Sequence, residues 1–390
     1  MATHVQAPQL GGPVQRGIGR SILLTLPIMV WSLLMFGNPS ANHDLMTRIA
    51  GGVTSVFMIA LFFLMMRTGT TYRWRRWFFV SAGLLFPIGF IHQIMVTRGT
   101  MGIPIEEMIA GRTPFCFLPI PLLILPAAFF RTVIFPGSIL PGGGMAREGI
   151  AAMVAIWLAI SLVVGKGWCS YACFFGGIEE GVAAIPKRAK IRKIDPRWRY
   201  LPWAVLLAMV LLSLALFEPA YCMWLCPFKA VSEYVAARNT IGLIQNAIFI
   251  VLFVALVIVL PFLTKKRTQC SFLCPFGAFQ SLFNKISAFD VRIDKEKCRT
   301  CVLCRDACPN MSLTKESIAK GEALMSCMKC GACVDACPRQ AISWHVKGTD
   351  VALKPERARL MFLYGAWAMA IMFGGSIITQ GLAVILGVFA

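Results

Sequence analysis

Seven apolar stretches constrain this fold more than any other feature of the 390-residue sequence. Each has about the 17–25 residues that a helix needs to cross a hydrocarbon core, or more. Backbone polar groups inside lipid must be satisfied within the segment, so these stretches predict transmembrane helices. Composition agrees, because 57% of the residues are hydrophobic and only 14% are charged. The predicted spans are residues 21–37, 49–66, 77–96, 150–167, 201–221, 242–263 and 360–388.

A further apolar stretch, residues 114–135, has the length of a span but contains three prolines. Proline removes a helical hydrogen bond and kinks a helix. If this stretch crossed the membrane, every later loop would change sides, and the basic loops described next would no longer share one side. We therefore predict a re-entrant or interfacial segment on the outer face, where non-helical backbone is covered by protein or lines a water-filled cavity.

Lysine and arginine collect in alternate loops, after the second, fourth and sixth predicted spans. They are Arg67, Arg73, Arg75 and Arg76, then Lys187, Arg188, Lys190, Arg192, Lys193, Arg197 and Arg199, then Lys265, Lys266 and Arg267. The positive-inside rule places these loops, the amino terminus and residues 290–350 on the cytoplasmic side of the membrane. The net charge of +20 then reflects topology beside anionic lipid rather than nucleic-acid binding.

Eight of the fifteen cysteines form two copies of one spacing, each followed by proline. The runs are Cys298-x2-Cys301-x2-Cys304-x3-Cys308 and Cys327-x2-Cys330-x2-Cys333-x3-Cys337. Such a run lets one tight loop hold three corners of a [4Fe–4S] cubane, and in two-cluster ferredoxins the fourth cysteine serves the other cluster. The spacing thus assigns Cys337 to the first three cysteines and Cys308 to the second three. Zinc does not explain the doubled run, and disulfides are unexpected in a reducing compartment.

Three further cysteine pairs share a Cys-x3-Cys spacing at the ends of predicted spans. They are Cys169/Cys173, Cys222/Cys226 and Cys270/Cys274. We interpret them as an internal repeat in which each pair precedes a short amphipathic helix. Proline after the second cysteine of two pairs suits the first turn of such a helix, whose amino terminus favours a thiolate or an anionic cluster. The first and third pairs share the cytoplasmic side, so their four thiolates predict a further cluster there.

The middle pair, Cys222/Cys226, falls on the outer face, together with Cys116 of the re-entrant segment. Three thiols there predict a metal centre with one non-cysteine ligand, or a redox-active disulfide with one thiol over. His92, beside Gln93 near the outer end of the third predicted span, is a candidate for that ligand or for a quinone contact. It is equally explained as a helix-end residue bonded to water.

Motifs for other cofactors are absent from the sequence. It has neither a Gly-x-Gly-x-x-Gly before a helix nor a Gly-x4-Gly-Lys-Ser/Thr, and no Cys-x2-Cys-His. The chain therefore gives no sign of binding nicotinamide, flavin, ATP or covalently attached haem by itself.

The combination of spans, Cys-x3-Cys-Pro motifs and a tandem cluster module resembles the membrane ferredoxins typified by NapH. It is also similar to the carboxy-terminal half of NosR-type proteins. The resemblance covers roughly residues 149–345 and is clearest at Cys270–Ala278 and Cys298–Pro338. It implies electron exchange between a quinone or cytoplasmic ferredoxin pool and an extracytoplasmic reductase or its maturation system. The chain departs from the family pattern by Phe174 where proline is usual, by the outer pair and by its first 148 residues.

The predicted architecture is mainly α, a membrane helical bundle of about seven spans plus one re-entrant segment. A small α+β bacterial-type two-cluster ferredoxin domain is inserted before the last span. The expected divisions are a cytoplasmic tail (1–20), a first membrane region (21–148), a second membrane region with the three pairs (149–289), the ferredoxin domain (290–350) and a final helix (351–390).

The predicted function is an electron-transfer subunit of an oxidoreductase complex, without substrate chemistry of its own. Its expected partners are membrane lipid and a soluble ferredoxin or flavodoxin, a quinone or an extracytoplasmic reductase, but no nucleic acid. The alternative is a maturation factor whose outer cysteines bind or reduce a metal. Clustered methionines would favour metal handling, but the outer stretches, which include Met101 and Met108, have no clustered Met-x-x-Met pattern. A redox sensor would need an output domain, for which the sequence offers no candidate.

Overall fold

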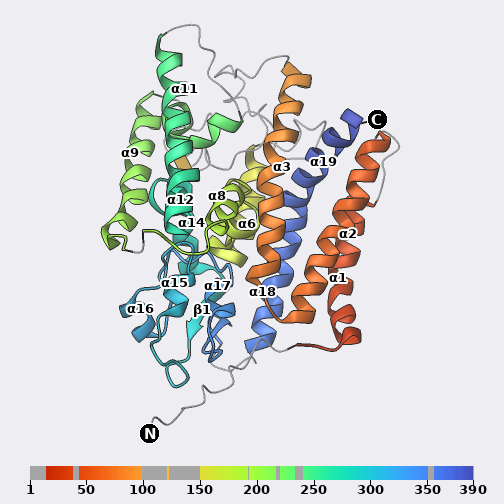
Figure 1. The fold of residues 1–390 in the computed structure, drawn as a ribbon, viewed down its shortest axis with the longest axis vertical. Helices are drawn as coiled ribbons and strands as arrows, with labels where there is room; N and C mark the ends of the chain where they lie inside the picture. The colour runs from red at the N-terminus through yellow and green to blue at the C-terminus, as the bar shows by residue number, and fades with distance from the viewer. Residues whose placement is uncertain are drawn as a thin grey trace.

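The computed structural model describes residues 15–37, 44–98, 121–122, 150–191, 193–216, 220–232, 240–349 and 355–389. Most of these residues are helical, as predicted. Figure 1 shows long helices side by side, with a small cysteine-rich module (residues 289–349) against one end of the bundle. The module lies at the end of the bundle from which α1 begins, and the last residues of α19 lie at the opposite end.

Four long helices form one side of the bundle. They are α1 (Ile18–Phe36), α2 (Leu45–Thr68), α3 (Tyr72–Arg98) and a continuous carboxy-terminal helix made of α18 (Pro355–Ala370), a π-helical turn η8 (Ile371–Gly375) and α19 (Ser376–Phe389). α19 packs on both α2 and α3, and α1 packs on α2. Glycines allow the close contacts, since a Cβ on Gly89 of α3 would lie 3.0 Å from the backbone nitrogen of Gly381. Small residues at helix crossings are typical of membrane bundles.

The other side of the bundle consists of shorter pieces. They are α6 (Ile150–Val164), η4 (Gly165–Gly167), α7 (Trp168–Tyr171), α8 (Phe175–Ala184), η5 (Pro196–Tyr200), α9 (Leu201–Leu216), α10 (Ala220–Trp224), η6 (Pro227–Val231), α11 (Thr240–Leu252), the π-helix η7 (Phe253–Val259), α12 (Leu260–Thr264), α13 (Thr268–Phe272) and α14 (Pro275–Ile286). A short helix follows each of the three long helical runs in this part and packs back against the bundle. The third of them, α13, follows the run made of α11, η7 and α12. The hydroxyl of Thr268, for example, donates to the Leu256 carbonyl oxygen at 2.6 Å.

Six helices in the described part of the chain are long and apolar enough to cross a membrane, one fewer than predicted. They are Ile18–Phe36, Leu45–Thr68, Val154–Tyr171, Arg197–Leu216, Thr240–Thr264 and Pro355–Phe389. The third predicted span lies in α3, which is 27 residues long but less apolar than the others. Its first turn carries Arg73, Arg75 and Arg76, and its side chains Phe78, Phe79 and Ala82 are buried by protein. One face of α3 therefore packs on α8 and α19, while apolar side chains such as Trp77 and Leu84 are exposed on another.

The predicted re-entrant segment 114–135 lies outside the described residues, apart from positions 121–122. The helices on either side of it are described. α3 begins against the module, because the backbone N–H groups of Thr71 and Tyr72 donate to the Asp335 carboxylate. α6 ends against the module, because Lys329 donates to the Val164 carbonyl oxygen. The end of α3 and the start of α6 therefore both point away from the module, and the non-crossing connection between them stays a prediction.

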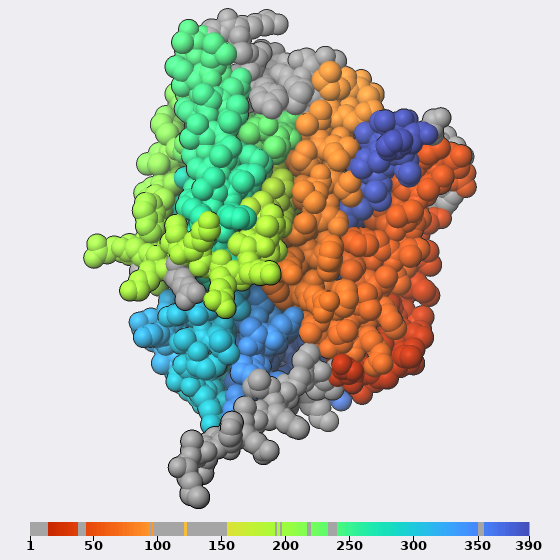
Figure 2. All heavy atoms as spheres, viewed as in Figure 1, coloured from red at the N-terminus to blue at the C-terminus, as the bar shows by residue number. Residues whose placement is uncertain are grey.

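The module is the small α+β unit expected from the sequence. Strands β1 (Phe289–Ile293) and β2 (Ile342–Val346) pair antiparallel, with Phe289 opposite Val346 and Ile293 opposite Ile342. Between them lie three short helices, α15 (Leu303–Ala307), α16 (Lys315–Lys320) and α17 (Ala332–Asp335). The space-filling view shows the module, in cyan and blue, in broad contact with the bundle (Figure 2).

Aromatic and polar contacts both fix the module to the bundle. The ring of Trp344 stacks on Phe362 of α18 with centroids 5.9 Å apart. Asn284 at the end of α14 donates to the carbonyl oxygens of Met325 and Cys327, both at 2.7 Å. Lys266 donates to the Cys308 carbonyl oxygen at 2.8 Å. These contacts hold the module directly against the membrane helices.

Candidate functional site

The module has two cysteine-lined cavities, and we call the one farther from the membrane bundle the outer cavity. It is lined by Cys298, Cys301, Cys304 and Cys337. Three of these thiols come from one loop and the fourth from the end of the other run. Cys301 is exposed, Cys304 is buried, and the other two are half-buried. Arg299 and Arg339 line the same cavity and are exposed. The cavity therefore lies at the water-facing side of the module with a basic rim.

The inner cavity of the module is lined by Cys308, Cys327, Cys330 and Cys333. Cys308, Cys330 and Cys333 are buried and Cys327 is half-buried. Met328 and Lys329 also line this cavity, and both touch groups of the membrane bundle. The two cysteine runs thus exchange their fourth cysteines, in the grouping that the spacing predicts, and the inner cavity is the one that faces the membrane.

The two cysteine loops have matching backbone strain. Thr300 and Lys329 stand two residues after the first cysteine of each run, and both have positive φ, at 50° and 52°. Val302 (φ 56°) and Gly331 (φ 87°) match in the same way. A left-handed conformation costs a non-glycine residue free energy. Two residues with positive φ in each loop bend the loop around its cavity. This curvature fits a compact group ligated from three sides.

Backbone N–H groups point at the sulfur atoms, as an anionic cluster would require. The N–H of Ser312 donates to Cys308 Sγ at 3.2 Å, and that of Ala341 donates to Cys337 Sγ at 3.3 Å. Among the described residues, no three His, Cys, Asp or Glu side chains lie close enough together to hold a single metal ion. Each cavity is lined by four thiols, so the residues present fit a [4Fe–4S] group.

Burial shifts the titration of groups around the inner cavity. It raises the pKa of Cys330 to about 12 and that of Cys327 to about 11. It lowers the pKa of Lys329 to about 7, against the opposing effect of the Cys327 thiolate. Free thiols here hold their protons at neutral pH, so ligation of a metal cluster releases those protons.

The structure brings the first and third Cys-x3-Cys pairs together in the bundle. We call Cys169, Cys173, Cys270 and Cys274 the membrane thiol set. Cys274 interacts electrostatically with Cys169 and Cys173, and Cys270 does so with Cys173 and Cys274. Cys274 is the N-cap of α14, whose first residue is Pro275, and its Sγ accepts the N–H of Gly277 at 3.3 Å. The helix expected after this pair is confirmed, and its amino terminus points at the thiols.

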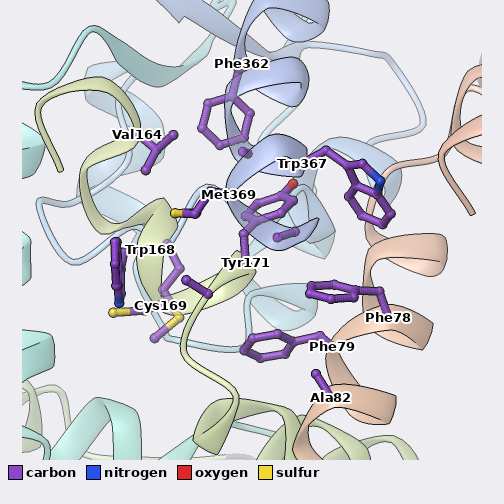
Figure 3. Close-up of a cluster of buried hydrophobic side chains, with 14 of the residues drawn as sticks. Phe78, Phe79, Ala82, Val164, Trp168, Cys169, Tyr171, Phe362, Trp367 and Met369 are labelled. Carbon is purple, nitrogen blue, oxygen red and sulfur yellow. The ribbon is translucent and has the colours of Figure 1, made fainter. Parts of the chain in front are cut away.

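Aromatic side chains enclose the membrane thiol set on the side of α18. Figure 3 shows Cys169 beside Trp168, with Tyr171, Phe79 and Phe362 filling the space between α3 and α18. Trp168 and Tyr171 are at most 1% exposed. Tyr171 meets Phe362 edge to face, with ring centroids 5.8 Å apart. This packing excludes water from the thiols on that side.

Two buried cations stand beside the membrane thiol set. Lys166 is 3% exposed. It lies close enough to Cys169, Cys274 and Cys270 to interact electrostatically with their sulfur atoms. Arg267 is fully buried, and its Nη2 donates to Cys270 Sγ at 3.1 Å and to the Cys169 carbonyl oxygen at 3.0 Å. A buried charge is costly unless it is paired. Two buried cations against four thiols therefore favour an anionic group at this set.

Arg267 also belongs to a buried network of four charges. Arg75 of α3 forms an ion pair with Glu180 of α8 and donates to the Ser170 carbonyl oxygen at 2.8 Å. Glu179 accepts the backbone N–H of Gln269 and lies 3.9 Å from Arg267 Nε. Arg267 Nη1 lies 3.9 Å from Glu180. The two arginines and two glutamates join α3, α8 and the segment before α13.

The Cys222/Cys226 pair does not lie at the surface of the bundle. Both thiols are 6% exposed, because α10 folds back so that the Ala220 N–H donates to Ser213 Oγ of α9. Tyr221 is buried between the two groups of thiols, where the charges of Cys226, Cys274 and Cys222 act on it. The side chain of Gln269 donates to its hydroxyl at 2.9 Å. The two thiols are therefore covered by protein, close to Tyr221, and their location toward the outer side of the membrane stays a prediction.

The structure gives little information on Cys116 and His92, the other two residues predicted for an outer site. Cys116 lies outside the described residues. His92 is exposed near the end of α3, and nothing in the described structure brings it to Cys222 or Cys226.

The charged residues beside the membrane thiol set were missed in the sequence, although a signal for them exists. Lys166 stands three residues before Cys169, and Arg267 stands three residues before Cys270. A basic residue at the same offset in both pairs is a repeat feature. Glu179 and Glu180 follow the first pair as an isolated acidic couple in an apolar sequence. Charges in such a setting mark functional positions by default.

Comparison with known families supports the same division of the chain. The family model described as "4Fe-4S binding domain" matches residues 148–193, 200–243 and 246–294. Each match contains one Cys-x3-Cys pair, so the predicted internal repeat is confirmed. The model described as "4Fe-4S dicluster domain" matches residues 290–338. No solved structure matches the chain.

Three curated relatives each match less than half of the chain, at low identity. YccM of Escherichia coli is 26% identical over 169 residues, 41% of this chain and 46% of YccM. The methylamine utilization ferredoxin-type protein MauN of Paracoccus denitrificans is 28% identical over 189 residues, 47% of this chain and 62% of MauN. The regulatory protein NosR of Pseudomonas aeruginosa is 28% identical over 169 residues, 40% of this chain and 21% of NosR. The chain thus matches less than two thirds of the length of each of these three. With its spans, its cysteine repeat and its dicluster module, the chain is similar to membrane-associated 4Fe-4S ferredoxin-type proteins, and the predicted resemblance to the NapH and NosR kind is confirmed.

Proposed function

We propose that this protein is a membrane electron-transfer subunit that carries electrons from a water-facing donor into the membrane. The observation that carries the proposal is the order of its three thiol sets. The exposed outer cavity of the module comes first, the buried inner cavity second, and the membrane thiol set third. Arg267 bridges the last two, because its Nη1 donates to Met328 Sδ and its Nη2 to Cys270 Sγ, both at 3.1 Å.

Bound [4Fe–4S] clusters would supply one-electron chemistry at these sets. The chain itself holds the sets close together, buries them and directs N–H groups at their sulfurs, which are the means by which a protein tunes such a group. We assign Cys298, Cys301, Cys304 and Cys337 to the outer cluster and Cys308, Cys327, Cys330 and Cys333 to the inner cluster. The membrane thiol set is proposed to hold a third.

The crossed assignment predicts a selective result for the Cys308→Ala variant. Loss of Cys308 should damage the inner cluster while the outer cluster, held by Cys298, Cys301 and Cys304, survives. EPR of the dithionite-reduced protein would resolve the two signals, and Cys337→Ala is the matched control that should damage the outer cluster instead. If Cys308→Ala removed the outer signal, the assignment would be wrong.

The donor is proposed to be an acidic redox protein such as a soluble ferredoxin or flavodoxin. Arg299 and Arg339 are exposed on the rim of the outer cavity, beside the exposed Cys301. A basic rim steers an acidic partner by long-range attraction that salt weakens. A quinone or an extracytoplasmic reductase would then accept electrons from the membrane side. The roles in which MauN and NosR are named, methylamine utilization and regulation, offer two contexts for such a subunit.

The proposed location is a prokaryotic inner membrane with the module in the cytoplasm. Topology tags near Arg188 and after Asp350 should both report cytoplasm, and a tag near Asn239 should report the opposite side. The reason is that the positively charged loops resist translocation. A cytoplasmic signal from the tag near Asn239 would contradict this arrangement and the reading of residues 114–135 as non-crossing.

The alternative of a metal maturation factor rests on Cys222 and Cys226. Delivery of a metal to a client protein needs accessible ligands, whereas both thiols are 6% exposed. Their position beside Tyr221 suits a redox or metal site within the bundle instead. We therefore favour electron transfer.

A further inference from the structure

Arg267 touches both of the thiol sets between which an electron would move. Its backbone N–H donates to the carbonyl oxygen of Pro309 at 2.8 Å, directly after Cys308. Its guanidinium donates to Met328 Sδ in the loop between Cys327 and Cys330. The same guanidinium donates to Cys270 Sγ and to the Cys169 carbonyl oxygen of the membrane thiol set. One side chain thus spans the contact between the module and the membrane.

The charge of Arg267 is less neutralised than that of Arg75. Arg75 forms a hydrogen-bonded ion pair with Glu180. The contacts of Arg267 with Glu179 and Glu180 are both 3.9 Å long, which is beyond hydrogen-bond distance. Its short contacts go instead to sulfur atoms and to a carbonyl oxygen. The positive charge of Arg267 is therefore directed at the membrane thiol set.

The guanidinium of Arg267 occupies the space next to Gly176, where any other residue would have a side chain. A Cβ on Gly176 would lie 1.6 Å from Arg267 Nη2 and 2.6 Å from its Cζ. Any side chain larger than hydrogen at position 176 must displace the guanidinium from its present place. Gly176 is four residues before Glu180, so α8 supplies both the space and the countercharge.

We propose that Arg267 is a positioning residue that raises the reduction potential of the centre at the membrane thiol set and fixes it against the inner cavity. This inference rests on the proposed function, in which that set holds an iron–sulfur cluster. Reduction adds one negative charge, which a nearby cation and an N–H···S hydrogen bond stabilise. One electron would leave the inner-cavity centre and enter the membrane centre, with no bond formed or broken. The hydrogen bond from Arg267 to Cys270 Sγ would favour the reduced state of the membrane centre.

The test is a potentiometric titration of the purified full-length protein, followed by EPR with dithionite as the reductant. Arg267→Gln removes the charge, and Gly176→Ala displaces the guanidinium while leaving the arginine in the chain. Both variants should retain the iron content of the wild type and shift the midpoint potential of the membrane centre to lower values. Arg267→Lys keeps the charge without the fork of N–H donors and should shift it less than Arg267→Gln. Arg16→Gln is the matched control, because Arg16 is also buried but pairs with Glu356.

The outcomes separate this inference from the proposed function. A wild-type protein with two clusters and no third centre would refute the proposed function itself. A third centre whose midpoint is unchanged in fully loaded Arg267→Gln would overturn only the role of Arg267. An equal shift in Arg16→Gln would do the same, since the effect would then be unspecific. Loss of iron from the membrane thiol set in all three variants at positions 176 and 267 would show a purely structural role and also overturn it.

Discussion

Replacing all four cysteines of the membrane thiol set with serine is expected to remove about four irons per chain, the content of one cubane cluster. The wild type should then contain about twelve and the variant about eight. Serine keeps the size of cysteine but is a poor ligand for iron, so the change removes the ligands with little change in packing. The two clusters of the module should still be reduced by dithionite, whereas electron transfer into the membrane should stop. Iron and sulfide quantification under anaerobic conditions, with EPR, measures both effects.

A double variant, Cys222→Ser with Cys226→Ser, is the control for this experiment. It also removes buried thiols from the bundle, but it leaves Cys169, Cys173, Cys270 and Cys274 in place. The irons of the membrane thiol set should therefore remain. An iron content in the quadruple variant equal to that of the wild type would refute the proposal of a third cluster. The two cysteine pairs would then be structural thiols that happen to lie on the same face.

The grouping of the thiols could be predicted because short-range spacing determines most of it. Cys298, Cys301 and Cys304 lie within seven residues, so one loop must bring them together, and the second run repeats the first. The start of α14 at Pro275 was likewise predictable, because proline after the N-cap position suits a first helical turn. Where Phe174 replaces that proline, the N-cap of α8 moves to Phe174 itself, one residue later than Cys274 in α14. Local chemistry was enough for these features.

Neither the burial of individual side chains nor the ion pairs between distant segments could be predicted from hydropathy. A window average predicts that residues 201–221 form one span, whereas α9 ends at Leu216 and α10 turns back toward Ser213. Cys222 is therefore covered by protein, which a hydropathy average does not show. Arg75 and Glu180 are 105 residues apart in the sequence, and Arg75 was read as part of a basic loop. Its burial follows from the close approach of α8 to α3, which depends on glycines that carry no hydropathy signal.

That close approach predicts a large loss of stability in the Gly177→Ala variant. A Cβ on Gly177 would lie 2.0 Å from the Phe79 carbonyl oxygen, a backbone atom that cannot move without moving α3. Across the crossing, a Cβ on Gly83 would lie 2.7 Å from the Ile178 nitrogen. Overpacking a rigid contact costs about 1–3 kcal/mol. Separation of α8 from α3 would also weaken the Arg75–Glu180 pair, and disrupting a buried ion pair costs about 3–5 kcal/mol.

Thermal unfolding in detergent, followed by tryptophan fluorescence, measures this loss, and iron retention on heating reports whether the membrane thiol set is affected with it. Gly52→Ala is the matched control, because nothing lies within 4 Å of a Cβ at that exposed position in α2. Alanine there should be neutral or stabilise the helix by up to about 1 kcal/mol. If Gly177→Ala unfolded at the same temperature as Gly52→Ala, α3 and α8 would not cross at backbone contact. The buried charge network beside Cys270 would then need a different support.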